Sequence, residues 1–120
     1  MTTLRIILAD DHPVVRSGLR LLLETHARAQ VVAEAATPAA LFQALGQVQA
    51  DLLLTDFIMP GRSGAELVEQ VRAEWPRVAV LMVTGHVEDD GVLPDGVELL
   101  RKPYRGAALL AAVEQAVRRR

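Results

Sequence analysis

Five short aliphatic runs punctuate the chain, and they constrain its fold more than any other feature. They occupy residues 4–9, 31–35, 52–55, 78–83 and 97–100. The runs are mostly continuous in apolar character rather than alternating, which is typical of strands buried on both faces of a parallel sheet. Helices must then cover both faces of that sheet. We therefore expect an α/β fold.

The segments between these runs carry helical patterns. An apolar stripe follows Pro13, and Thr37 before Pro38 is typical of a helix N-terminus. Two later stripes have helical spacing: Leu67, Val71 and Trp75, and then Leu109, Val113 and Val117. Alternating strands and helices predict right-handed βαβ units and a doubly wound, five-stranded parallel sheet.

One connection departs from this pattern. Residues 85–96 contain Gly85, Gly91, Pro94 and Gly96. Glycine and proline both disfavour helix. We therefore expect the helix between the fourth and fifth strands to be short or irregular.

Composition limits the class of protein. A chain of 120 residues with 51% apolar residues can bury one hydrophobic core, so a single domain over residues 1–120 is expected. The absence of cysteine excludes disulfides and thiolate ligands. A net charge of −2 argues against general attraction to nucleic acid or to an anionic membrane. The apolar runs are too short to cross a bilayer and the start lacks a signal peptide, so we expect a cytoplasmic location.

Polar residues follow the predicted strands where each one ends. Asp10 and Asp11 follow the first strand, Asp56 the third, Thr84 the fourth and Lys102 the fifth. Ligands of open parallel sheets bind at the carboxyl ends of the strands, where the strand order reverses. If the order is 2-1-3-4-5, these five residues meet at one edge. Each alone has an ordinary explanation as a helix-terminus acid, a turn residue or a surface group, but all of them sharing one edge favours a site.

The chemistry of this set points to phosphoryl transfer. Neighbouring carboxylates repel one another unless a cation joins them, and an all-oxygen site suits Mg²⁺. Lys102 could then bind a phosphoryl oxygen and Thr84 could donate a hydrogen bond to another. A carboxylate beside Mg²⁺, such as Asp56, can act as a nucleophile and form an aspartyl phosphate.

Four motifs together resemble the receiver domain of two-component response regulators. They are I-L-A-D-D-H-P at 7–13, L-T-D-F-I-M-P-G-R-S-G at 54–64, V-T-G at 83–85 and R-K-P-Y at 101–104. The resemblance covers essentially the whole chain, and the motifs are specific in this order and spacing. It implies the flavodoxin-like sheet order 2-1-3-4-5 within the large superfamily of CheY-like domains.

The resemblance also implies a role for each site residue. Asp56 would be the phosphoacceptor. Asp11 and Asp56 would bind Mg²⁺ directly, together with the backbone carbonyl of Ile58, and Asp10 would act mostly through water. Lys102 would contact the phosphoryl group, and the Thr84 hydroxyl would move toward it.

Two features bear on how such a switch is read out. Leu99 stands where the family often carries a tyrosine or phenylalanine, three residues before the lysine. The opening at 12–24 is similar to receivers fused to helix-turn-helix DNA-binding domains, whereas the short segment at 85–96 is similar to receivers of hybrid sensor kinases. The output partner is therefore left open. His12, before Pro13, is expected to shape the helix start rather than to bind metal.

These observations favour a phosphoacceptor switch that receives a phosphoryl group from a histidine kinase or a histidine phosphotransfer protein. Such a module turns over no separate metabolite and itself binds neither nucleic acid nor membrane. A Mg²⁺-dependent phosphatase with an aspartyl nucleophile is the main alternative. Such enzymes carry Asp-x-Asp on the first strand, whereas this chain has the adjacent aspartates Asp10 and Asp11 after its first strand. A nucleotide or flavin binder would need a glycine-rich or hydroxyl-rich phosphate-binding loop after the first strand, where this chain has D-D-H-P. A degenerate receiver that only binds partners is disfavoured by the complete set of site residues.

Overall fold

The computed structural model describes residues 3–26, 28–56, 64–84, 97–101 and 104–119. Strands and helices alternate over most of this length, as the apolar runs predict. The elements are β1 (Leu4–Ala9), α1 (Pro13–His26), β2 (Ala29–Ala35), α2 (Pro38–Gln47), β3 (Leu52–Asp56), α3 (Gly64–Glu74), β4 (Ala79–Thr84), β5 (Glu98–Arg101) and α4 (Gly106–Arg119). The expected irregular helix at 85–96 lies outside the described residues.

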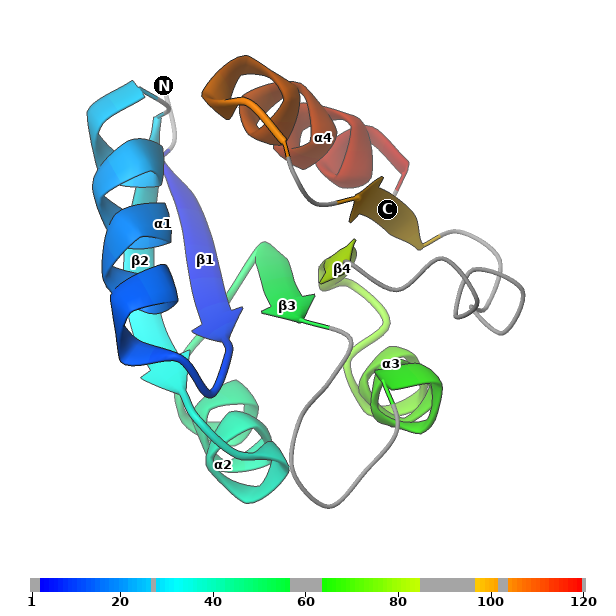
Figure 1. Ribbon diagram of the computed structural model, residues 1–120. Coiled ribbons are helices and arrows are strands. Elements are labelled where there is room, and N and C mark those ends of the chain that lie inside the picture. The colour runs from blue at the N-terminus through cyan, green and yellow to red at the C-terminus, as the bar shows by residue number, and fades with distance from the viewer. Residues whose placement is uncertain (1–2, 27, 57–63, 85–96, 102–103, 120) are drawn as a thin grey trace.

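The five strands form one parallel sheet in the order β2-β1-β3-β4-β5 (Figure 1). This confirms the doubly wound, flavodoxin-like architecture. The order reverses between β1 and β3, so the ends of these two strands lie side by side. None of the helices in the described parts of the chain is long and apolar enough to cross a membrane.

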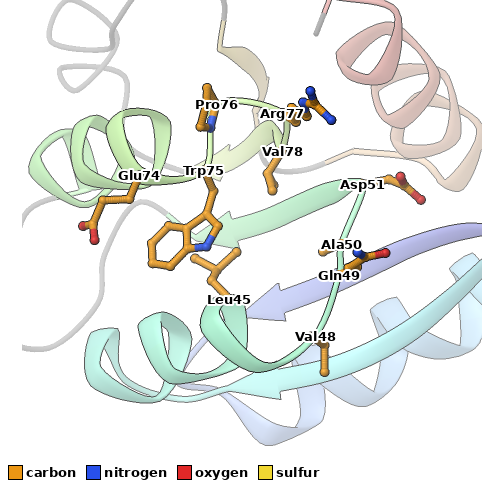
Figure 2. Close-up of a pocket in the computed structure, with 10 residues that line it drawn as sticks. All are labelled: Leu45, Val48, Gln49, Ala50, Asp51, Glu74, Trp75, Pro76, Arg77 and Val78. Atoms are coloured by element: carbon orange, nitrogen blue, oxygen red, sulfur yellow. The ribbon is translucent and has the colours of Figure 1, made fainter.

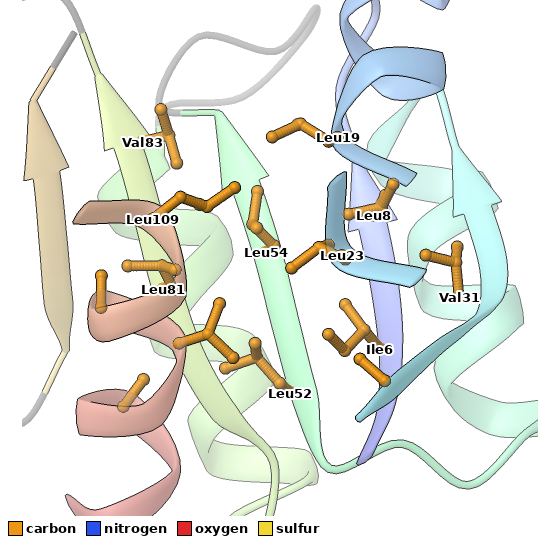
Figure 3. Packing of buried hydrophobic residues seen from close by; sticks show 14 of the residues in the cluster. Ile6, Leu8, Leu19, Leu23, Val31, Leu52, Leu54, Leu81, Val83 and Leu109 are labelled. Carbon is orange, nitrogen blue, oxygen red and sulfur yellow. The ribbon is translucent and has the colours of Figure 1, made fainter. Parts of the chain in front are cut away.

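In the described part of the chain, each face of the sheet is covered by two helices. Helices α1 and α4 enclose one apolar layer, which includes Leu19 and Leu23 of α1 and Leu109 of α4 (Figure 3). Helices α2 and α3 enclose the other layer, with Leu41 and Val71 fully buried. Helices on both faces explain why the strands read as continuous apolar runs rather than as alternating ones.

The start of α2 follows from its sequence. Thr37 has an extended backbone, and its side-chain hydroxyl accepts a hydrogen bond from the Ala40 backbone N–H at 3.2 Å. Pro38 occupies the first turn, where its missing N–H costs no helical hydrogen bond. The predicted N-terminus is confirmed.

Strand β2 contains one irregularity. Ile6 of β1 pairs with Val31, but the next residue, Ile7, pairs with Ala33, so that Val32 is an extra residue in the register. Pairing then continues regularly to Ala9 and Ala35 at the carboxyl end. The bulge is therefore confined to the middle of the β1–β2 pair.

Candidate functional site

The acidic residues lie where the sheet register brings two strand ends together. Ala9 of β1 pairs with Thr55 of β3, so Asp10 and Asp56 each follow a paired residue at the same edge of the sheet. Asp56 in turn pairs with Val83, the residue before Thr84 on β4. This edge is the one at which ligands of open α/β sheets bind.

Asp10 is held rigidly at the end of β1. Its backbone N–H donates to the carbonyl of Ala35 at 3.0 Å, which continues the β1–β2 ladder by one bond. Its side chain is 5% exposed, and Oδ1 accepts the backbone N–H of His12 at 2.8 Å. A buried carboxylate needs such partners, since an unpaired one would be costly.

Asp11 is less satisfied. Its side chain is 32% exposed, but its Oδ1 atom is buried and accepts no hydrogen bond from any described residue. The His12 Nδ1 atom lies 2.9 Å from that oxygen and 3.0 Å from Asp10 Oδ1. The contact with Asp11 has the distance of an ion pair without hydrogen-bond geometry. Among the described residues, Asp11 Oδ1 therefore keeps an unused acceptor capacity, as a cation ligand would require.

The donor set fits Mg²⁺. Asp10, Asp11 and His12 offer ligand atoms that all lie within 4.8 Å of one another. Two of the three are carboxylates, the ligands that hard cations prefer, whereas an imidazole nitrogen suits softer metals. A cation here would also offset the repulsion between the two adjacent acids.

His12 behaves largely as expected. Its carbonyl accepts the Arg16 N–H at 3.0 Å, the first hydrogen bond of α1, and its own N–H is capped by Asp10. The position of its ring beside both carboxylates was not predicted. Only the tertiary arrangement of the loop shows it.

Arg16 is a further residue that the sequence did not single out. Its Nη1 atom donates to the backbone carbonyl of Asp10 at 2.6 Å, and its Nε atom donates to Glu34 Oε1 at 3.1 Å. Glu34 lies near the end of β2, 18 positions further along the chain. No local pattern in the sequence signals this contact, because it depends on how β2 pairs with β1.

The structure describes part of the predicted site. The side chains of Asp10 and Asp11 lie together as expected. Asp56 and Thr84 are the last residues of β3 and β4, so the predicted strand ends are confirmed. Ile58 and Lys102 lie outside the described residues.

A cavity of about 750 Å³ lies at the opposite edge of the sheet (Figure 2). It opens between the carboxyl ends of α2 and α3, next to the amino ends of β3 and β4. Its lining residues are Leu45, Val48, Gln49, Ala50, Asp51, Glu74, Trp75, Pro76, Arg77 and Val78. None of the predicted site residues is among them.

The fold and the position of the acidic loop together define a doubly wound α/β domain with adjacent carboxylates at its switch point. The family model "Response regulator receiver domain" matches residues 6–114, and the chain belongs to this family of two-component signalling domains. The resemblance found in the sequence is thereby confirmed.

Two bacterial regulators are among the similar proteins. The transcriptional regulatory protein YdfI of Bacillus subtilis is 30% identical over 100 residues, which cover 83% of this chain and 46% of YdfI. The response regulator protein VraR of Staphylococcus aureus is 32% identical over 90 residues, which cover 75% of this chain and 43% of VraR. The chain thus spans less than half the length of these curated relatives.

Solved structures give the same picture. The isolated receiver (REC) domain of RcsB from Salmonella enterica serovar Typhimurium, determined with the phosphomimetic BeF₃⁻, is 27% identical with a TM-score of 0.85. The match covers 95% of this chain and 90% of that domain. RcsB bound to the promoter rprA gives a TM-score of 0.86 at 28% identity, covering 94% of this chain and 67% of RcsB.

Proposed function

We propose that this chain is a phosphoaspartate switch. Asp56 accepts a phosphoryl group from a histidine kinase or a histidine phosphotransfer protein, in a reaction that requires Mg²⁺. The observation that carries the proposal is the β1–β3 register, because it sets Asp56 beside the loop that holds Asp10 and Asp11. The family match supports it, since receiver domains are the phosphoacceptors of two-component systems.

The cation would be held by Asp10, Asp11, Asp56 and the backbone carbonyl of Ile58. The buried Oδ1 atom of Asp11, which accepts no hydrogen bond from the described residues, supports this assignment. When bound, Mg²⁺ would neutralise charge that develops on the phosphoryl oxygens. The carboxylate of Asp10, already committed to the His12 N–H, would act mostly through water.

The transfer step is a displacement at phosphorus. A carboxylate oxygen of Asp56 forms the new O–P bond while the N–P bond of the donor phosphohistidine breaks. The bonding pair returns to the imidazole nitrogen, which then takes a proton from solvent. Lys102 contacts a phosphoryl oxygen as a point charge, and the Thr84 hydroxyl donates to another.

Water reverses the modification by attacking the aspartyl phosphate and releasing inorganic phosphate. The chain then returns to its starting state without having consumed any metabolite other than its donor. Receiver domains are typically not metabolic enzymes. This distinguishes the proposal from a phosphatase that acts on a separate phosphate ester.

The relatives favour a DNA-binding output. YdfI is a transcriptional regulatory protein, and the RcsB structure with a promoter contains DNA. We infer that the phosphorylated chain acts on transcription through a separate DNA-binding domain, since the receiver itself has no excess of positive charge. Of the two output classes that the sequence leaves open, this proposal favours the helix-turn-helix regulators.

Intact-mass measurement after incubation with a small phosphodonor tests the proposal. The wild-type chain should gain the mass of one phosphoryl group with Mg²⁺ and much less without it. Asp56→Asn should gain none, because an amide is not a comparable nucleophile. Undiminished uptake by Asp56→Asn, with no other aspartate newly labelled, would reject Asp56 as the acceptor.

The same protein separates the switch from the phosphatase. A chromogenic phosphate ester, supplied with Mg²⁺, should be hydrolysed at no more than the background rate. Repeated turnover of the ester that disappears in Asp56→Asn would instead favour the enzyme.

A further inference from the structure

The peptide group between Asp10 and Asp11 is held by a residue outside the predicted site. The carbonyl oxygen of Asp10 accepts a hydrogen bond of 2.6 Å from Arg16 Nη1. We propose that Arg16 is a positioning residue for the cation site, anchored by Glu34, and that it fixes the direction in which Asp11 leaves β1. This inference rests on the proposed function, because it concerns the same Mg²⁺ site.

Peptide geometry links the Asp10 carbonyl to the position of Asp11. The carbonyl of Asp10 belongs to the same planar unit as the backbone nitrogen and Cα of Asp11. Fixing that carbonyl therefore fixes the plane from which the Asp11 side chain starts. The other side of Asp10 is fixed as well, since its N–H binds the Ala35 carbonyl. Arg16 thus supplies the restraint that the β1–β2 ladder cannot provide beyond its last bond.

Arg16 is itself held at a second point. Its Nε atom donates to Glu34 Oε1, while the other carboxylate oxygen accepts from Arg20 Nη1 at 2.8 Å. The side chains of Arg16 and Glu34 are only 18% and 29% exposed, against 49% for Arg20. A guanidinium can bridge two acceptors in a fixed fork, and partial burial limits competition from water. The contact between Arg16 and the loop is therefore rigid.

Charge and positioning make opposite predictions for Arg16. The positive charge of Arg16 lies close to the acidic loop and repels Mg²⁺. On charge alone, removal of Arg16 would therefore strengthen Mg²⁺ binding. If Arg16 acts by orienting the Asp10–Asp11 peptide, its removal should weaken Mg²⁺ binding instead. Outer-shell partners of metal ligands typically contribute about 10- to 100-fold to metal affinity. The sign of the change therefore separates the two effects.

The experiment is a titration of the full chain with Mg²⁺ alone. The NMR chemical shifts of the amides in the acidic loop measure binding at each Mg²⁺ concentration. Arg16→Met should bind Mg²⁺ about tenfold more weakly than wild type. Arg16→Lys should also bind more weakly despite its retained charge, because one ammonium group cannot span the carbonyl and Glu34 as the fork does. Arg20→Gln is the matched control: it removes a neighbouring charge of the same helix and another partner of Glu34, and should change the affinity by less than about twofold.

The outcomes are distinguishable. Equal or tighter binding by folded Arg16→Met overturns the inference and leaves the proposed function intact. Absence of Mg²⁺ binding by the wild-type chain overturns the proposed function and the inference with it. If Arg16→Met does not fold, Arg16→Lys decides, since wild-type affinity in that variant would also reject the role of the fork. Circular dichroism of each variant establishes that it is folded.

Discussion

The indole of Trp75 stacks on the ring of Phe42, with centroids 6.1 Å apart and planes inclined by 17°. Phe42 belongs to α2, and Trp75 is the residue that follows α3. The pair thus joins α2 to the end of α3 on one face of the sheet, next to the cavity at its amino edge (Figure 2). Trp75 is the single tryptophan of the chain, so its fluorescence reports on this contact.

Phe42→Ala should lower the free energy of unfolding by about 1–2 kcal/mol. The estimate combines loss of the stacked pair with loss of a half-buried ring, and is therefore smaller than for a fully buried phenylalanine. Urea denaturation followed by circular dichroism measures the change, while the Trp75 emission of the folded variant should move toward that of an exposed indole. An unchanged emission spectrum would mean that the stack is not populated in solution.

Thr37→Ala should lower the free energy of unfolding by about 1 kcal/mol, because the Ala40 N–H loses the side-chain acceptor that caps α2. Thr37→Ser keeps that acceptor and should remain close to wild type. Chemical denaturation of the two variants makes the comparison. Equal losses for alanine and serine would show that the methyl group, rather than the hydroxyl, is responsible.

Leu23→Ala should lower the free energy of unfolding by about 2–5 kcal/mol. Leu23 is fully buried in the layer between α1 and the sheet, so its truncation removes apolar contacts and leaves a cavity (Figure 3). Val14→Ala, on the same helix but 84% exposed, should change stability by no more than about 0.5 kcal/mol. Thermal or urea denaturation measures both changes. Similar losses of stability in the two variants would contradict the burial of Leu23.

Asp11→Asn should affect the chain in opposite directions with and without Mg²⁺. Removing one of two adjacent acids relieves repulsion, so the metal-free variant should be as stable as wild type or slightly more stable. Its Mg²⁺ affinity should fall more than that of Asp10→Asn, because Asp11 offers an oxygen without a hydrogen bond whereas Asp10 Oδ1 is occupied. Denaturation with and without Mg²⁺, together with a Mg²⁺ titration, checks both parts. A larger loss of affinity in Asp10→Asn would reverse the assignment of the two carboxylates.

The sheet was predictable because a strand buried on both faces is encoded by a continuous apolar run. Each aliphatic run overlaps a strand, although β2 begins at Ala29, two residues before its run at 31–35. Ends of elements were harder to place. Trp75 continues the apolar stripe of α3 but lies just beyond the helix, since the helix ends at Glu74 before the turn that contains Pro76. Periodicity records which residues are buried, and it does not record where the backbone hydrogen bonds stop.

The site was predictable to the extent that it consists of strand ends. Asp10, Asp56 and Thr84 could be placed by counting from apolar runs, and the reversal of strand order then predicts one edge. The support around the acidic loop was not predictable. Arg16 and Glu34 come from different elements, and each alone resembles an ordinary surface charge. Their contact depends on tertiary register, which leaves no short-range pattern.

The bulge in β2 also determines which side of the sheet Glu34 faces. Before the bulge, Val31 faces the layer under α1 and α4, whereas after it Ala33 packs in the layer under α2 and α3. Val32 thereby shifts the odd–even alternation of the strand, and Glu34 faces the arginines of α1 instead of the opposite apolar layer. Deletion of Val32 would leave Ala33 and Glu34 opposite Ile7 and Leu8, so the strand would become regular and the carboxylate would keep its side. A regular strand that retained Val32 would instead turn Glu34 toward the layer under α2 and α3. The bulge that accommodates Val32 thus keeps the anchor of the acidic loop on the side of α1.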